Sequence, residues 1–164
     1  MRVGWSDAVA LTSFYDDWDD MPTTPGVYII CAHRPIPRIG GVDRRGILYI
    51  GRASRVRSRL WNFWYCNHTA SGFLWTHPDI ARLVLGGNIR SVADVERKLG
   101  RLTARYATPI RSAQLGRAER ALLFAYVRAF GEAPPLNLSL TKRWDRAPTA
   151  YELRWAERGL FEGV

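Results

Sequence analysis

The chain contains little cysteine and no long hydrophobic run. Its two cysteines, Cys31 and Cys66, are too few for the disulfide framework that small secreted domains use. No apolar stretch approaches the roughly 18 residues that a membrane-spanning helix needs. The N-terminal residues contain no secretory hydrophobic segment and turn acidic early. We therefore expect a cytoplasmic protein that makes no contact with a membrane.

Repeats and low-complexity segments are also missing, which favours a single folded unit. The chain has 164 residues, of which 47% are apolar and 24% charged, and this composition excludes a disordered tail. A chain of this length buries roughly 70% of its unfolded surface, enough for a core without disulfide bonds. We expect residues 1–25 to form an acidic lead-in that packs on one domain over residues 26–164.

Lysine is nearly absent, although the chain is basic. Only Lys98 and Lys142 are lysine among 24 cationic residues, and the formal net charge is +9. Residues 1–25 carry a net charge of −4, residues 26–146 carry +14, and residues 147–164 carry −1. The planar guanidinium group suits phosphate and base edges better than an ammonium group does. The pattern indicates a phosphate-rich partner, and the alternative is an arginine-rich codon usage without functional meaning.

Strand patterns occur at two places that are close in the sequence. Residues 26–32, GVYIICA, are β-branched and aromatic and predict a buried strand, and residues 47–51, ILYIG, predict its return strand. The intervening basic segment, residues 33–45, contains prolines and glycines, so we expect an inserted loop without regular structure. Two consecutive prolines lead into residues 136–139, which we expect to form a short strand or edge segment.

Helix patterns account for most of the remaining sequence. Ser54 and Thr149 are suitable N-caps, and Gly131 is a usual helix stop. The expected helices cover residues 6–18, 54–64, 78–85, 91–106, 115–130 and 149–159. The fold class is α+β, with a small antiparallel three-stranded sheet flanked by helices and a helical insert over about residues 65–112. The apolar side of the last helix is either core or the face of a homodimer.

Two tyrosines and a run of arginines indicate a site for a phosphate group. Because side chains alternate along a strand, Tyr28 and Tyr49 can reach one cleft from two paired strands. Four of the eight residues 52–59 are arginine, and a helix that begins there adds backbone N–H groups that bind anions. We expect nucleic acid to contact the arginines of this run and of the inserted loop, together with one histidine: Arg52, Arg55, Arg57, Arg44, Arg45 and His68.

The order of these motifs resembles that of the GIY-YIG nuclease superfamily. The family pattern is a GIY triplet, a YIG triplet, an arginine about ten residues after the second tyrosine, a helix glutamate and a late asparagine. Residues 26–28 read GVY and residues 49–51 read YIG, and Arg59 comes ten residues after Tyr49. The resemblance extends over roughly residues 26–140 and implies the fold described above.

Two further residues complete the resemblance, and three features depart from it. Glu119, in RAERALL, matches the helix glutamate, and Asn137, in PPLN, matches the late asparagine. The tyrosines of the triplets are 21 residues apart, about twice the usual minimum, and the glutamate and asparagine are 18 apart. Phe63 stands where the family often has histidine or tyrosine, so that role is either lost or taken over by Trp64, Tyr65 or His68.

The resemblance implies a metal-dependent DNA endonuclease, in restriction, phage defence, repair or mobile-element biology. Glu119 would hold Mg²⁺ or Mn²⁺, and Arg59 would help to neutralise the charge that develops on the phosphoryl oxygens. Either Tyr28 or Tyr49 would act as the base or orient water, with a pKa lowered by the nearby cations. Asn137 would hold backbone or a catalytic side chain through hydrogen bonds.

Three other interpretations stay open at this point. The same fold could bind nucleic acid with weak or no catalysis, for which Phe63 is the warning sign, or the chain could be a basic structural protein of a ribonucleoprotein. The aromatic residues around Trp61 are either core or a surface that stacks on bases. A zinc site at Cys66, His68 and His77 is disfavoured, because a fourth ligand is missing. The sequence does not distinguish DNA from RNA.

Overall fold

Three antiparallel ladders join the four strands of the main sheet. The structure, a computed structural model, describes residues 3–11, 18–65, 92–137 and 146–162. The strand order is β1-β6-β2-β5, so the sheet has four antiparallel strands rather than the three expected from the sequence. The bounds of these strands are Val9–Ala10 for β1, Gly26–Ala32 for β2, Ile47–Ala53 for β5 and Leu102–Ala107 for β6.

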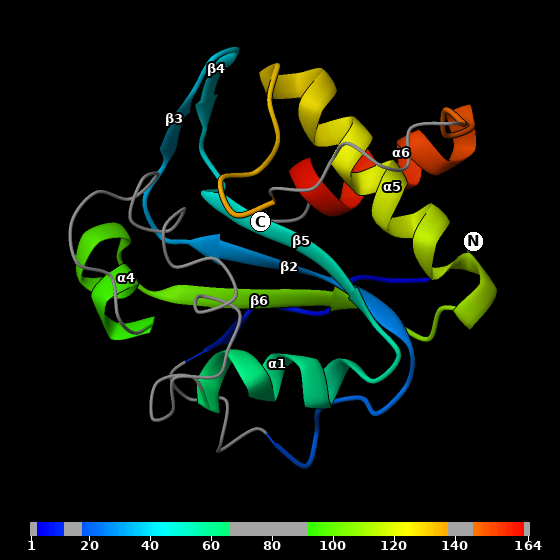
Figure 1. Ribbon diagram of the computed structural model, residues 1–164, viewed down its shortest axis with the longest axis horizontal. Coiled ribbons are helices and arrows are strands. Elements are labelled where there is room, and N and C mark those ends of the chain that lie inside the picture. The colour runs from blue at the N-terminus through cyan, green and yellow to red at the C-terminus, as the bar shows by residue number, and fades with distance from the viewer. Residues whose placement is uncertain (1–2, 12–17, 66–91, 138–145, 163–164) are drawn as a thin grey trace.

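Helices cover both faces of this sheet, as Figure 1 shows. Helix α1 lies on one face, over a core cluster that includes Tyr28 and Leu60, and α5 and α6 lie on the other face, over a cluster that includes Ile29 and Trp155. The helix bounds are Val56–Tyr65 for α1, Val92–Leu99 for α4, Ser112–Phe130 for α5 and Ala150–Phe161 for α6. The molecule is therefore an α+β protein, as predicted.

Three of the expected helices, α1, α5 and α6, are confirmed. Local signals in the sequence mark the end of α5 and the start of α6. Helix α5 ends at Gly131, whose φ of 74° is the left-handed conformation that glycine adopts readily. Helix α6 begins after Thr149, which forms a capping box with Glu152. Trp155 and Leu160 of α6 are buried against α5, so this side of the helix belongs to the core. None of the helices among the described residues is long and apolar enough to cross a membrane.

The helix predicted over residues 91–106 is wrong in its second half. Gly100, at φ 79°, ends the helix at Leu99, and the chain continues as strand β6. The misleading signal is Leu102, which continues the helical spacing of Leu99 but here begins a strand whose burial nearly alternates. The expected helical insert over residues 65–112 therefore contains a central strand of the sheet, and residues 66–91 lie outside the described part.

Two further expectations concern the edges of the domain, and the first of them is wrong. The helix expected over residues 6–18 is absent from its described part, because β1 pairs with β6, with Val9 opposite Ala104. Of the two alternatives for residues 136–139, the described residues 136–137 form the edge segment and not a strand, because the Leu136 N–H donates to the Leu48 carbonyl at 3.0 Å along the outer edge of β5. The rest of that expected segment, residues 138–139, lies outside the described residues.

The loop expected over residues 33–45 contains regular structure. Strands β3 (Ile36–Arg38) and β4 (Gly41–Asp43) form a separate two-stranded hairpin. Its return to β5 is fixed by Asp43, a buried carboxylate that accepts hydrogen bonds from the Ile47 backbone N–H at 2.8 Å and the Tyr126 hydroxyl at 3.0 Å. Prolines do not prevent this hairpin, because a two-stranded ribbon has outer edges that need no N–H donor.

Candidate active site

The two motif tyrosines lie on the same face of the sheet, beneath α1. Tyr28 of β2 is opposite Gly51 of β5, and Tyr49 is opposite Ile30, so the tyrosines are diagonal neighbours. Their ring centroids are 5.9 Å apart, and the planes are tilted by 40°. A Cβ at Gly51 would lie 2.5 Å from the Tyr28 hydroxyl oxygen, so only glycine leaves space for this pair.

Arg59 of α1 joins the two tyrosines into one cluster. Its Nε donates a hydrogen bond of 3.0 Å to the Tyr28 hydroxyl oxygen. Tyr28 is fully buried, whereas Tyr49 and Arg59 are partly exposed. The guanidinium of Arg59 also interacts with the Tyr49 phenol, and the two phenols act together to raise the pKa of Arg59 against the effect of its burial. We call Tyr28, Tyr49 and Arg59 the tyrosine–arginine cluster.

Electrostatics in this cluster differ from the expectation. Burial raises the pKa of Tyr28 far above its ordinary value, and the neighbouring Tyr49 raises it further, while Arg59 opposes both. Burial likewise raises the pKa of Tyr49, against the effect of Arg59. The predicted lowering of a tyrosine pKa is therefore wrong for the protein by itself. The free energy lost when a phenolate is removed from water exceeds the stabilisation that the half-buried Arg59 guanidinium gives it.

The helix glutamate lies on the opposite face of β5. Arg52 points toward α5, and its Nε is 3.2 Å from Oε2 of Glu119, with side-chain exposures of 35% and 22%. Gly116, one turn before Glu119, provides the space, because a Cβ there would lie 2.6 Å from Arg52 Nη1. Strand β5 is an edge strand of the sheet, so groups on its two faces can approach each other around this edge. Glu119 is close enough to Tyr49 to contribute to the raised pKa of that phenol.

Asn137 holds the edge of β5, the strand that contributes to both the tyrosine–arginine cluster and the Arg52–Glu119 ion pair. Its Oδ1 accepts from the Ile50 backbone N–H at 2.8 Å, and its Nδ2 donates to the Ile50 carbonyl at 2.7 Å. The side-chain amide thus replaces the neighbouring strand that an edge residue lacks. Ile50 separates Tyr49 from Gly51, so this pair of hydrogen bonds fixes the segment of β5 that carries the YIG triplet. Asn137 therefore holds backbone rather than a catalytic side chain.

The backbone part of the anion site predicted at the start of α1 is wrong. The Val56 and Arg57 backbone N–H groups donate to the carbonyls of Thr24 (3.3 Å) and Pro22 (2.9 Å), so they do not face a ligand. The Arg57 side chain donates to the Met21 carbonyl at 2.8 Å, and its guanidinium lies 5.3 Å from the centre of the Trp18 ring. Arg57 therefore anchors the lead-in, and its contact with nucleic acid stays a prediction.

The remaining predicted contacts are spread over the molecule. Arg55 is exposed before α1, and Arg44 is exposed after β4. Neither side chain has a hydrogen-bond or ion-pair partner among the described residues. Arg45 is partly buried, and burial lowers its pKa, with the nearby Arg105 adding to the effect. His68 lies outside the described residues.

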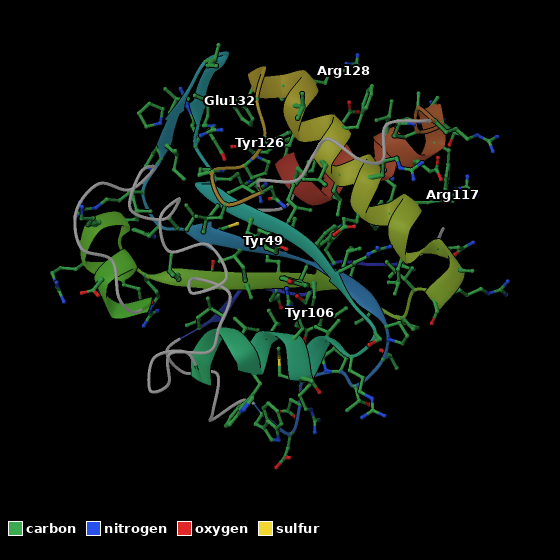
Figure 2. All side chains as sticks on the ribbon, in the orientation of Figure 1. Tyr49, Tyr106, Arg117, Tyr126, Arg128 and Glu132 are labelled. Carbon is green, nitrogen blue, oxygen red and sulfur yellow. The ribbon has the colours of Figure 1, made fainter. Side chains whose placement is uncertain are left out.

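One residue on the face of the tyrosine–arginine cluster was missed. Tyr106 of β6 is directly opposite Tyr28 and packs against the same core cluster. Figure 2 labels Tyr49 near the middle of the sheet and Tyr106 between β6 and α1. The signal that could have located Tyr106 is Gly100, since a glycine after Leu99 favours ending the helix there.

Metal ligands are few in the described part of the chain. No group of three or more histidine, cysteine, aspartate or glutamate side chains comes together there. A hard divalent cation prefers oxygen ligands and can keep several waters, so the partly exposed carboxylate of Glu119 fits as a single protein ligand. No protein-family model, curated protein or solved structure matches the chain.

Proposed function

We propose that the chain is a metal-dependent endonuclease of the GIY-YIG type that hydrolyses phosphodiester bonds in DNA. The observation that carries this proposal is the hydrogen bond from Arg59 to Tyr28 beside Tyr49, because it joins three residues of the family pattern from three separate elements. The strands β6, β2 and β5, with α1 on one face and α5 on the other, support the corresponding fold.

Each residue of the tyrosine–arginine cluster has a role that follows from its exposure. Hydrolysis of a phosphodiester develops negative charge on the phosphoryl oxygens and on the leaving oxygen, which the half-buried Arg59 can stabilise. Tyr49 is partly exposed and has a raised pKa, so it acts as a neutral phenol that orients the attacking water. Tyr28 is buried and cannot reach a substrate, so it positions Arg59.

Glu119 is the residue proposed to hold Mg²⁺ or Mn²⁺. When bound, the cation supplies charge neutralisation at the phosphate. One carboxylate makes a weak site, so we expect binding to depend on the phosphates of the nucleic acid as additional ligands. Arg52 pairs with Glu119 in the protein alone and would exchange this carboxylate for phosphate.

The test is nicking of a supercoiled plasmid with Mg²⁺, with Mn²⁺ and with EDTA. We expect metal-dependent conversion to nicked or linear DNA, and a loss of at least about 100-fold in Glu119→Ala. Glu157→Ala is the matched control, because Glu157 is also a helix carboxylate facing an arginine, but on α6. Labelled RNA in the same assay decides whether DNA or RNA is the substrate. A monomer that cuts one strand at a time gives mainly nicked plasmid, whereas a homodimer that cuts both strands gives linear plasmid.

A second candidate function is nucleic-acid binding without cleavage. The observation that favours it is the ion pair between Arg52 and Glu119, which occupies the carboxylate that catalysis needs. A gel shift on the same samples distinguishes the two functions. Retained DNA binding with an intact plasmid under every metal condition would support the binding module and refute the nuclease.

A further inference from the structure

The β3–β4 hairpin presents an apolar face to solvent. Pro37 and Val42 are paired in register, so their side chains lie on one face, and Ile39 follows at the turn. Ile39 is 83% exposed, Val42 is 55% exposed, and Pro37 is exposed as well. Among the described residues, Tyr151 of α6 is the only other large hydrophobic side chain that is exposed. The exposed apolar surface is thus concentrated on this hairpin.

The opposite face of the hairpin is fixed to the end of α5. Arg38 forms an ion pair of 3.1 Å with Glu132, whose other carboxylate oxygen accepts from the Ile39 backbone N–H at 2.8 Å. The Gly40 N–H donates to the Phe130 carbonyl at 2.9 Å. Figure 1 shows the hairpin rising beside the last turns of α5. Because the hairpin is already held in place, a ligand that binds its outer face does not have to order it first.

Exposed cations surround the base of the hairpin. Arg34 precedes β3 and donates from Nη1 to the Lys98 carbonyl at 2.9 Å, which brings this arginine beside the end of α4. Arg44 follows β4, and Arg101 precedes β6. All four of these side chains are exposed, and no described carboxylate forms an ion pair with the three arginines. Cations at the base of a hairpin whose tip is apolar suit a polyanion, whereas two copies of a chain with net charge +9 repel each other.

We propose that this hairpin is a duplex-binding element that inserts Ile39 and its apolar neighbours at a base step in the minor groove. Isoleucine and proline on a fixed scaffold are among the side chains that unstack such a step and kink the duplex. The strands are about 10 Å long, comparable with a minor groove about 7.5 Å deep. The inference rests on the proposed function and deepens it, because it names a bent double strand as the substrate.

The experiment measures binding and bending of a duplex of about 30 base pairs labelled for energy transfer at its ends. EDTA is present throughout, so cleavage does not interfere. The variants are Ile39→Ser, Ile39→Ser with Val42→Ser, and Tyr151→Ser as the control for loss of an exposed apolar side chain elsewhere. We expect the wild type to bend the duplex, and the double variant to lose about tenfold in affinity together with the bend. Melting temperatures should stay the same, because these side chains are exposed.

The outcomes separate this inference from the proposed function. Bending that is lost in the Ile39 variants and kept in Tyr151→Ser supports the hairpin as the wedge. Duplex binding and bending that are equal in all variants overturn the wedge and leave the nuclease standing. Metal-dependent cleavage of single strands, measured separately without EDTA, together with no duplex binding also overturns the wedge alone, whereas no binding and no cleavage overturn both. A wild-type dimer that Ile39→Ser converts to a monomer would instead assign the hairpin to self-association.

Discussion

Replacing Asn137 tests whether its amide supports the edge of β5. The Asn137→Ala change removes the acceptor of the Ile50 N–H and the donor to the Ile50 carbonyl, whose distances are 2.8 and 2.7 Å. Ile50 is fully buried. A buried backbone group left without a partner costs about 1–3 kcal/mol. Two such groups would cost about 2–6 kcal/mol together. Because Asn137 is partly exposed and water can reach the gap, we expect the lower part of this range, a loss of about 2–4 kcal/mol in the free energy of unfolding.

The Asn137→Asp change separates the donor from the acceptor. The new carboxylate still accepts from the Ile50 N–H, but its second oxygen faces the Ile50 carbonyl oxygen and repels it. Protonation restores a donor, so the folded state raises the pKa of this carboxyl. The stability of the variant is then highest below the unfolded pKa of about 3.9, and it is lost as the pH rises toward the folded pKa. We expect the deficit relative to wild type to be at least about 1 kcal/mol smaller at pH 4 than at pH 7.

Urea unfolding at both pH values measures these differences. Gln114→Glu is the control, because it makes the same kind of change at an exposed residue of α5. Surface changes of this kind stay within about 0.5 kcal/mol. A cost below that limit for Asn137→Ala, or a deficit in Asn137→Asp that does not change with pH, would refute the role of this amide.

Three other predictions follow from buried or capped groups. Gly51→Ala should destabilise the protein by about 1–3 kcal/mol, since its Cβ would overlap Tyr28; an unchanged melting temperature would contradict this. Thr149→Ala should cost about 1 kcal/mol at neutral pH. Although burial opposes it, hydrogen bonding to Thr149 lowers the pKa of Glu152. Stability from this group is present above the unfolded pKa and is lost as the pH falls through the folded one, so urea unfolding should show the Thr149→Ala deficit shrinking below about pH 4. Burial raises the pKa of the Cys31 thiol to about 12, and the nearby carboxylate of Asp43 adds to this effect. In a Cys66→Ser background, iodoacetamide at pH 8 should therefore modify the folded protein more than about 100-fold more slowly than the urea-unfolded chain; equal rates would show that the thiol is not buried.

The candidate site was predictable where its signal is local in the sequence. The GVY and YIG triplets sit in β-branched runs, so the pairing of β2 with β5 and the shared face of Tyr28 and Tyr49 follow from strand alternation. Arg59 lies in a helix that the sequence predicts, although this helix begins at Val56, two residues after the expected N-cap Ser54. The shared face of the two tyrosines is therefore encoded by short-range patterns.

The use of each arginine could not be predicted from the sequence. Arg52, Arg57 and Arg59 lie in one run and have the same side chain, yet their partners are Glu119, the Met21 carbonyl and Tyr28. These partners come from segments between 31 and 67 residues away in the chain. A guanidinium is committed to whichever acceptor the fold brings near it, and no local pattern encodes that choice.

The sequence by itself determined the α+β class, the β2–β5 pair and the helices α1, α5 and α6, because periodicity, caps and helix stops act within a few residues. Only the tertiary structure decided that residues 102–107 form a strand, since a strand is stabilised by partners remote in the chain, here β2 and β1. It also decided that burial raises the tyrosine pKa values, because the loss of water around a phenol depends on everything that packs against it.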